Sequence, residues 1–238
     1  MKVGIICAGD RELAPFLPHI EQCKTSQKAM LTFYEGFIKK VSIVTLFCGV
    51  CKTNAAIATQ ILIDTYHVDY VINAGTAGGM DERLNIFDTV ISTEVAHHDV
   101  HEVILTDFHP WMPSVFFKSD DVLLQRSRSA VARFAPGHEI YFGRMVTGES
   151  FITDSGRDEI NAVFEPLTVD METASIAHVC YVNNLPFIAV RTLTDTATHS
   201  GAEHFDKNVV TASHIAKDIV LEVLKEMKEA DRSGGDKQ

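Results

Sequence analysis

The stretch YVINAGTAGG, residues 70–79, carries the pattern that decides the fold. Its first four residues form a short apolar run, and a glycine-rich segment follows at once, so we expect a buried strand that ends in a turn. Residues 2–7, KVGIIC, repeat the pattern and pass into Ala8-Gly9-Asp10. Two strands of this kind, separated by a helical stretch, predict a sheet covered by helices.

Strand and helix patterns alternate along the rest of the chain. We also expect strands at 30–37 and 41–47, which form a hairpin, and at 88–94, 139–146, 167–170 and 187–192; helices are expected at 10–17, 53–66, 120–134, 172–182 and 206–229. No linker divides the chain, which predicts one three-layer α/β/α domain with a central mixed, mostly parallel sheet. We expect this domain to span 1–230 and the polar residues 231–238 to form a tail.

Composition narrows the class of partner. The 238 residues carry a formal net charge of −11, which argues against a nucleic-acid ligand because such proteins present a basic face. No stretch approaches the roughly 20 apolar residues that cross a bilayer. Five cysteines at scattered positions suit a reducing compartment. We therefore expect a cytoplasmic protein with a small-molecule ligand and without a membrane partner.

Polar side chains follow several of the expected strands. Ligands of open α/β sheets bind beyond the carboxyl ends of the strands, so residues at these positions should meet at one rim. The candidates are Glu12 after the first strand, Gly75 and Thr76 after 70–73, Met171 and Glu172 after 167–170, and Asp195 after 187–192, with Arg191 inside that last strand.

Two of these carboxylates suggest chemistry, and each has an ordinary alternative. Glu172 begins a helix in an apolar segment of small residues, so burial would demand partners such as the two hydroxyls of a ribose; it could also simply complement the helix dipole. Asp195 could donate a proton to a base nitrogen if burial raised its pKa. The alternative for Asp195 is a turn or cap aspartate.

Five motifs resemble those of the methylthioadenosine/S-adenosylhomocysteine nucleosidases, within the wider nucleoside phosphorylase superfamily. They are Asn73-Ala-Gly-Thr-Ala-Gly-Gly79, Val146-Thr-Gly-Glu-Ser-Phe-Ile152, Val169-Asp-Met-Glu-Thr-Ala174, Ile176-Ala-His-Val-Cys180 and Val190-Arg-Thr-Leu-Thr-Asp195. The likeness covers nearly the whole chain. It implies hydrolysis of the bond between adenine and the sugar of a 5′-thionucleoside, with 5′-deoxyadenosine or aminodeoxyfutalosine as related substrates, and a place in methionine salvage.

The resemblance also implies a role for particular residues. Asp195 would protonate N7 of the purine, Glu12 would position or activate the water that attacks C1′, and Glu172 would hold the ribose hydroxyls. The remaining implied contacts are Arg191 and Thr76 with the water and ribose, Met171 under the sugar, Phe151 and the backbone of Ile152 on the adenine, and Val50 and Phe205 around the 5′ group. Gly75 would let the backbone approach the sugar closely. No cofactor and no metal is implied.

The family resemblance also implies a homodimer. In the family, the loop that corresponds to 99–113 crosses into the neighbouring subunit and completes its 5′ pocket. Val103, Leu105 and Phe108 are the candidates for that contact here, and the apolar residues Trp111, Met112, Val115, Phe116 and Phe117 are the candidates for the interface.

This loop is also where the chain departs most from the family. The first loop differs as well: Gly9-Asp10-Arg11-Glu12 stands where Met-Glu-Glu-Glu is common, and only Glu12 matches the catalytic position.

Two other functions stay open from the sequence. Gly9-Asp10-Arg11 is similar to a phosphorylase phosphate loop, and Arg11 could bind phosphate, although Glu12 would repel the dianion in the same pocket. A nucleoside-binding protein without activity is the second alternative, against which the intact set Glu12, Glu172 and Asp195 speaks.

Two short motifs receive ordinary interpretations. Cys48-Gly-Val-Cys51 has the spacing of a redox pair, but we favour a strand-end turn. His97-His98-Asp99-Val100-His101 has metal-binding residue types, but we favour an interface loop.

Overall fold

Strand β1 (Lys2–Cys7) lies inside a ten-stranded sheet in the computed structural model, which describes residues 1–133, 137–153, 156–196 and 202–235. The other strands are β2 (Glu21–Lys28), β3 (Leu31–Ile38), β4 (Val41–Phe47), β5 (Tyr70–Gly79), β6 (Thr89–His97), β7 (Phe117–Lys118), β8 (Ile140–Thr147), β9 (Thr168–Asp170) and β10 (Phe187–Asp195). Their order is β10-β6-β8-β9-β5-β1-β4-β3-β2, with β7 beside β6 and a further pairing of β10 with β5.

The sheet is mixed, as predicted. Strand β1 runs parallel to both β4 and β5, β5 runs parallel to β10, and β6 runs parallel to β8. Antiparallel pairs stand at the β2–β3–β4 edge and where β10 meets β6. The short strand β9 is parallel to β8 and antiparallel to β5, so the ends of these three strands come together.

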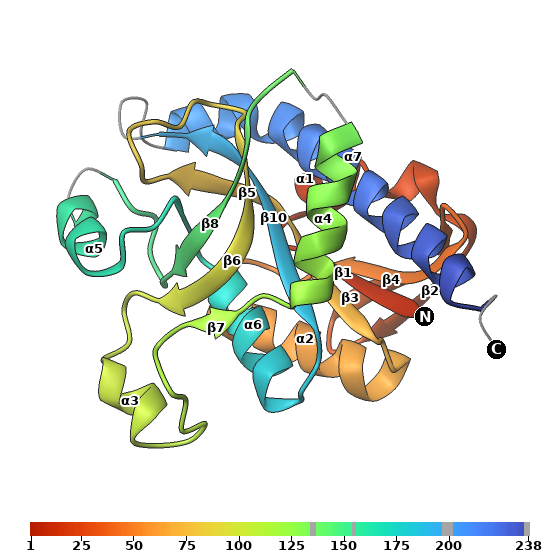
Figure 1. Ribbon diagram of the computed structural model, residues 1–238, viewed down its shortest axis with the longest axis horizontal. Coiled ribbons are helices and arrows are strands. Elements are labelled where there is room, and N and C mark those ends of the chain that lie inside the picture. The colour runs from red at the N-terminus through yellow and green to blue at the C-terminus, as the bar shows by residue number, and fades with distance from the viewer. Residues whose placement is uncertain (134–136, 154–155, 197–201, 236–238) are drawn as a thin grey trace.

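Helices cover both faces of the sheet (Figure 1). The helices are α1 (Asp10–Leu13), α2 (Lys52–Tyr66), α3 (Glu102–Thr106), α4 (Asp121–Arg133), α5 (Arg157–Phe164), α6 (Thr173–Val182) and α7 (Ala202–Gly235), with one 3-10 turn, η1 (Leu17–His19). Helices α1, α4 and α7 pack together on one face, and α2 packs against α6 on the other. The prediction of three layers is therefore confirmed.

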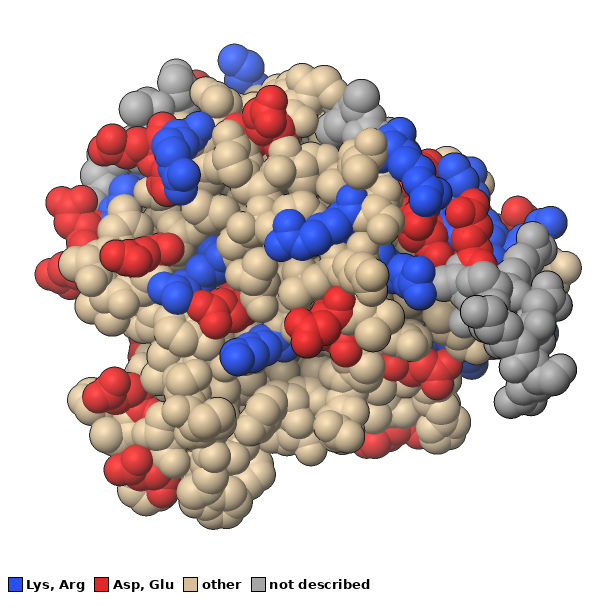
Figure 2. Space-filling model, viewed as in Figure 1, with Lys and Arg blue, Asp and Glu red and all other residues tan. Residues whose placement is uncertain are grey.

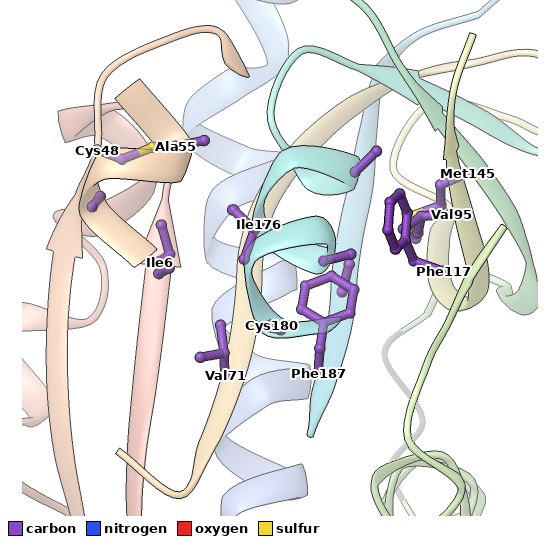
Figure 3. Packing of buried hydrophobic residues seen from close by; sticks show 14 of the residues in the cluster. Ile6, Cys48, Ala55, Val71, Val95, Phe117, Met145, Ile176, Cys180 and Phe187 are labelled. Atoms are coloured by element: carbon purple, nitrogen blue, oxygen red, sulfur yellow. The ribbon is translucent and has the colours of Figure 1, made fainter. Parts of the chain in front are cut away.

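Alternation along β1 explains the two cores. Val3 and Ile5 point to the α7 face and share a cluster with Leu224, whereas Ile6 points the other way and shares a cluster with Ile176 of α6. Successive side chains of a strand face opposite sides of a sheet, so an apolar run without polar interruption is what a strand covered on both faces requires. Figure 3 shows Ile6 together with apolar residues of α2, β5, α6 and β10.

The structure corrects the prediction for residues 74–79. The sequence predicts a turn after Asn73, but β5 continues to Gly79 and pairs with β10 from Val71 to Gly78. Glycine signals turns in general, yet it also occurs in strands where another group approaches the backbone closely. A Cβ at Gly75 would stand 2.5 Å from the Glu12 carboxylate, and a Cβ at Gly78 would stand 3.0 Å from Oδ2 of Asp195. The glycines therefore make room beside a strand.

Several elements escaped prediction. Strand β2 is polar and exposed throughout, since it pairs only with β3 at the sheet edge and has no apolar face to reveal it. Helix α5 was not predicted, and α3 lies within the segment expected to be a loop. Helix α1 ends at Leu13 rather than at residue 17, and α7 runs on to Gly235, so residues 231–235 of the expected tail are helical. Among the described helices, none combines the length and apolar character of a bilayer span.

Candidate active site

A cavity of about 370 Å³ opens where β1, β5, β9 and β10 end, beside the start of α7. Nine of the residues predicted for the site line it: Glu12, Val50, Thr76, Phe151, Ile152, Met171, Glu172, Asp195 and Phe205. These residues come from segments far apart in the chain. The strand-end rule therefore located the cavity, while the role of each residue in it stays a prediction at this point.

Glu12 is held from several sides at once. One carboxylate oxygen accepts hydrogen bonds from the backbone N–H of Ala8 at 2.7 Å and of Gly9 at 3.2 Å. The other accepts from the backbone N–H of Thr76 at 2.7 Å and from its hydroxyl at 2.8 Å. Glu12 is only 5% exposed, and these donors offset the cost of burying its carboxylate.

Gly75 makes this arrangement possible. A Cβ at position 75 would stand 2.5 Å from the carboxyl carbon and from Oε1 of Glu12, which no real side chain tolerates. The carboxylate thus lies directly against the backbone of β5. Gly75 was predicted to let the backbone approach a sugar; in the structure the group that approaches it is Glu12.

Glu172 stands at the start of α6 and is 4% exposed. Its Oε1 accepts a hydrogen bond from the backbone N–H of Cys51 at 2.9 Å, and its Oε2 lies 3.3 Å from Nη2 of Arg191. Burial raises the pKa of Glu172 above its ordinary value, with a further contribution from neighbouring Asp170, while Arg191 opposes the rise. A ligand that donated hydrogen bonds to this carboxylate would favour its ionised form.

Arg191 lies behind the cavity wall and is completely buried. Its guanidinium contacts three carboxylates: Nε lies 3.1 Å from Asp170, Nη2 lies 3.3 Å from Glu172, and Nη1 lies 3.7 Å from Glu12. Burial alone would lower the pKa of Arg191, but these carboxylates hold it above its ordinary value. Arg191 does not line the cavity, so it can act on a ligand only through the groups that it positions.

Asp170 is a site residue that the sequence did not single out. It is 8% exposed and lines the cavity. Its Oδ1 accepts hydrogen bonds from the Thr147 hydroxyl at 2.6 Å and from the backbone N–H of Thr173 at 3.0 Å, and its Oδ2 pairs with Arg191. Its position at a strand end directly before Met171-Glu172 was the one signal that could have identified it.

Asp195 lines the cavity at the end of β10. The hydroxyl of Thr194 donates to Oδ1 at 2.8 Å, and the side chain is nearly fully buried. Burial raises the pKa of Asp195 to about 6, although the Thr194 hydrogen bond and the charges of Arg157 and His204 oppose the rise. Near neutral pH, a carboxyl with this pKa can both hold and release a proton.

Aromatic rings form the outer wall. Phe151 and Phe205 approach edge to face with ring centroids 6.5 Å apart. The guanidinium of Arg11 lies 5.2 Å from the Phe205 ring and pairs with Asp206 at 3.0 Å. Phe151 remains 43% exposed, which leaves its face available to a flat ligand.

The three residues predicted to reach a neighbouring subunit do not line this cavity. Val103 is half-buried on α3, and Phe108 is 61% exposed beyond it. Leu105 is a correction: it is 3% exposed and packs in the core of its own chain, because α3 turns it inward. It is therefore not available to a neighbouring molecule in this conformation.

The histidine segment packs against aromatic rings. The His97 ring lies 6.0 Å from Phe117 and 5.9 Å from His178, and burial lowers the pKa of His97 to about 4. Within the described ranges, no three His, Cys, Asp or Glu side chains converge as metal ligands would. Cys48 and Cys51 are free thiols, and burial raises the pKa of both, which disfavours the thiolate that redox exchange requires.

Comparison with known proteins gives one consistent result. The phosphorylase superfamily model matches residues 2–225. A 5′-methylthioadenosine/S-adenosylhomocysteine nucleosidase of Bacillus subtilis is 36% identical over 231 residues, which cover 94% of this chain and 99% of that protein.

Solved structures agree. The corresponding nucleosidase of Colwellia psychrerythraea, in complex with adenine, is 32% identical with a TM-score of 0.87 and covers 95% of each chain. The Neisseria meningitidis nucleosidase, in complex with methylthio-immucillin-A, is also 32% identical with a TM-score of 0.87, and the match covers 94% of this chain and 98% of that one.

A substitution at Gly75 tests the packing of Glu12. We expect Gly75→Ala to push the carboxylate away from Thr76 and to lower the free energy of unfolding by about 1–3 kcal/mol, since buried acceptors lose their donors. Gly9→Ala is the matched control, because a Cβ at Gly9 meets nothing within 4 Å. Urea unfolding of both variants measures the difference. Equal stability of Gly75→Ala and the unsubstituted chain would contradict this account of Glu12.

Proposed function

Since this chain belongs to the phosphorylase superfamily and, within it, to the 5′-methylthioadenosine/S-adenosylhomocysteine nucleosidases, we propose that it hydrolyses the N-glycosidic bond of adenine 5′-thionucleosides. The products are free adenine and the thio-substituted sugar. One observation carries the proposal: Glu12, Glu172 and Asp195 are all buried and all line one cavity of about 370 Å³. That volume lies within the range of small-ligand sites, about 300–1,000 Å³.

Asp195 is the general acid in this proposal. Cleavage moves the electron pair of the C1′–N9 bond onto the base, and a proton from Asp195 to N7 makes the departing adenine neutral. The raised pKa of Asp195, about 6, supports this role because the proton is present yet weakly enough held to transfer. Phe151, at the outer wall, stacks on the adenine, and the backbone of Ile152 pairs with its edge.

Glu12 acts on the water. The water oxygen forms a bond to C1′ and its proton passes to Glu12, which is a hydrogen-bond acceptor fixed by Ala8 and Thr76. Fixing the acceptor before reaction lowers the entropic cost of the attack. The hydroxyl of Thr76 helps to orient the water and the ribose.

Glu172 binds the 2′ and 3′ hydroxyls of the ribose. Glu172 lines the cavity, where the diol adds two donors to those that Cys51 and Arg191 already supply to the buried carboxylate. Met171 packs under the sugar, and Val50 and Phe205 surround the 5′ substituent. Negative charge on Glu12 and Glu172 also stabilises the cationic character that the sugar develops as the bond breaks.

Phosphorolysis is less well supported. Among the described residues that line the cavity, Arg11 is the sole lysine or arginine, and it already pairs with Asp206 at 3.0 Å. A phosphate dianion there would face Glu12, Asp170 and Glu172. Hydrolysis by a neutral water molecule meets no such repulsion.

We also propose a homodimer whose neighbouring subunit completes the 5′ end of the cavity. Phe108 and Trp111 support it, because they are 61% and 67% exposed on one loop. Exposed aromatic side chains of this kind are characteristic of interfaces. Val103 and Phe108 are the residues proposed to reach the partner. Sedimentation at micromolar concentration tests the proposal, and a monomer that is fully active would contradict it.

Action in the cytoplasm, within methionine salvage, is a further proposal. Five free cysteines support a reducing compartment, and the family's substrates are the thionucleosides that such salvage recycles. A nucleic-acid partner is disfavoured by the net charge of −11, and on the face in Figure 2 acidic and basic side chains are interspersed. Accumulation of methylthioadenosine after deletion of the gene would support the pathway, and unchanged levels would contradict it.

The direct test of the reaction is base release by the purified chain. Methylthioadenosine, S-adenosylhomocysteine, 5′-deoxyadenosine and adenosine are incubated with and without inorganic phosphate, and free adenine is measured by chromatography. We expect adenine from the 5′-thio substrates at a rate that phosphate does not change. A strict phosphate requirement would establish phosphorolysis instead, and binding without adenine release would establish a non-catalytic protein.

Removal of the acid tests its role. We expect Asp195→Asn to lower kcat by about 10²–10⁴-fold while KM changes little, since the amide fills the same space but cannot protonate the base. Asp206→Asn is the matched control at an aspartate whose side chain is 67% exposed, and its kcat should stay nearly unchanged. Steady-state kinetics with methylthioadenosine measures both. Near-normal kcat in Asp195→Asn would remove the acid from the mechanism.

The pH dependence follows from the raised pKa of Asp195. The free enzyme needs the protonated acid, so kcat/KM should fall as pH rises through about 6. An aspartate in an unfolded chain titrates near 3.9, so the stability that this group contributes is complete below that pH and is lost as pH rises through about 6. Asp195→Asn should therefore resist urea better than the unsubstituted chain at pH 8. Equal stability of the two at pH 8 would contradict the raised pKa.

A further inference from the structure

Arg157 is a buried cation that the proposed mechanism does not use. It stands at the start of α5 and is 6% exposed. Its Nη1 donates to the carbonyl oxygen of Gly79, the last residue of β5, and lies 3.3 Å from the sulfur of Met80. A guanidinium has five N–H donors, and one contact of this kind satisfies few of them.

Within the part of the chain that the structure describes, neither Nε nor Nη2 of Arg157 has a hydrogen-bond partner. Unpaired buried donors of a charged group are costly. Attachment of α5 to β5 does not require this cost, since Asn161 of the same helix already donates to the carbonyl oxygen of Met80 at 3.3 Å. A smaller neutral side chain would serve that purpose.

Arg157 contacts the same backbone segment of β5 against which Asp195 packs. In the β5–β10 pairing, Asp195 stands opposite Gly78. A Cβ at Gly78 would be 3.0 Å from Oδ2 of Asp195, and a Cβ at Gly79 would be 3.4 Å from its carbonyl oxygen. The guanidinium of Arg157 therefore binds Gly79, and the side chain of Asp195 packs against the preceding residue, Gly78.

We propose that Arg157 is a positioning residue for the general acid: it fixes the Gly78–Gly79 strip and supplies the positive charge that stabilises the Asp195 carboxylate once its proton has moved to the base. The inference rests on the proposed function of Asp195. When the proton transfers to N7, a buried carboxylate forms, and a fixed cation nearby lowers the free energy of that charge without reorganisation. Among the described residues, Nε and Nη2 of Arg157 donate to no acceptor, and the ion pairs found there do not include Arg157.

Of the residues that the structure describes, Arg157 and His204 are the charged groups that act on Asp195. Burial raises its pKa, while the Thr194 hydroxyl, Arg157 on α5 and His204 on α7 each act to lower it. His204 is half-buried, so solvent screens its charge more than that of Arg157. Arg157 is therefore the cation whose removal should affect the acid most.

Two substitutions separate the charge from the structural contact. Arg157→Gln and Arg157→Lys both keep a donor for the Gly79 carbonyl, but only the lysine keeps the charge. The readouts are the titration of the ¹³C-labelled Asp195 carboxyl, assigned by comparison with Asp195→Asn, and the pH profile of kcat/KM. Arg83→Met removes the same charge at a fully exposed position and is the control.

In Arg157→Gln, we expect the pKa of Asp195 to rise by roughly one unit and kcat to fall about tenfold. Arg157→Lys and Arg83→Met should keep the pKa of the unsubstituted chain. An unchanged Asp195 titration in Arg157→Gln, or an equal shift in the glutamine and lysine variants, would overturn the proposal.

The carboxyl titration does not depend on turnover. A chain that releases no adenine would refute the proposed function and yet leave the influence of Arg157 on Asp195 measurable. If Arg157→Gln does not fold, Arg157→Met removes the charge in its place: a raised Asp195 pKa supports the proposal and an unshifted one overturns it.

Discussion

One buried guanidinium organises the site. Arg191 has no exposed surface and lies within 4 Å of Glu12, Asp170 and Glu172. Burying any of these charges alone would be strongly unfavourable, and the cluster exists because each charge offsets the others. The planar guanidinium presents its nitrogens in fixed directions, so the three carboxylates are set by geometry as well as by charge. Helix α1, strand β9 and helix α6 therefore meet at one point.

The charge balance of this cluster suits the proposed chemistry. Three carboxylates around one cation leave net negative charge at the cavity wall, on the side proposed for the sugar, which becomes electron-poor as the glycosidic bond breaks. Asp195 belongs to a separate environment at the end of β10, where burial keeps its proton available near neutral pH. Two environments in one cavity thus suit the different roles proposed for these carboxylates, as the pairing of an acid with a base in glycosidases also requires.

Much of the site could be predicted because its residues follow the carboxyl ends of strands. Glu12, Glu172 and Asp195 follow apolar runs, and the carboxyl ends of parallel strands meet at one edge. The sequence does not predict which of these side chains form ion pairs or hydrogen bonds with one another. Asp170 and Arg157 look like an ordinary strand-end aspartate and helix-start arginine until their partners are known.

The errors in the predicted fold also have physical causes. Residues 74–79 were expected to turn because glycine favours turns, whereas here glycine admits the Glu12 and Asp195 side chains beside an uninterrupted strand. Strand β2 carries no apolar alternation, since it lies at an exposed edge and is held by its hydrogen bonds to β3. The family resemblance implies a partner contact for Leu105, but α3 directs this side chain into the core of its own chain.

The geometry of Arg191, and not merely its charge, assembles the site. Measuring kcat/KM for methylthioadenosine in Arg191→Lys tests this most directly, because lysine keeps the positive charge but cannot reach three carboxylates in fixed directions. We expect a loss of about 10²-fold or more, as misplacement of catalytic groups by about 1 Å produces, in a variant that still folds. An Arg191→Lys enzyme with unchanged kcat/KM would contradict the claim.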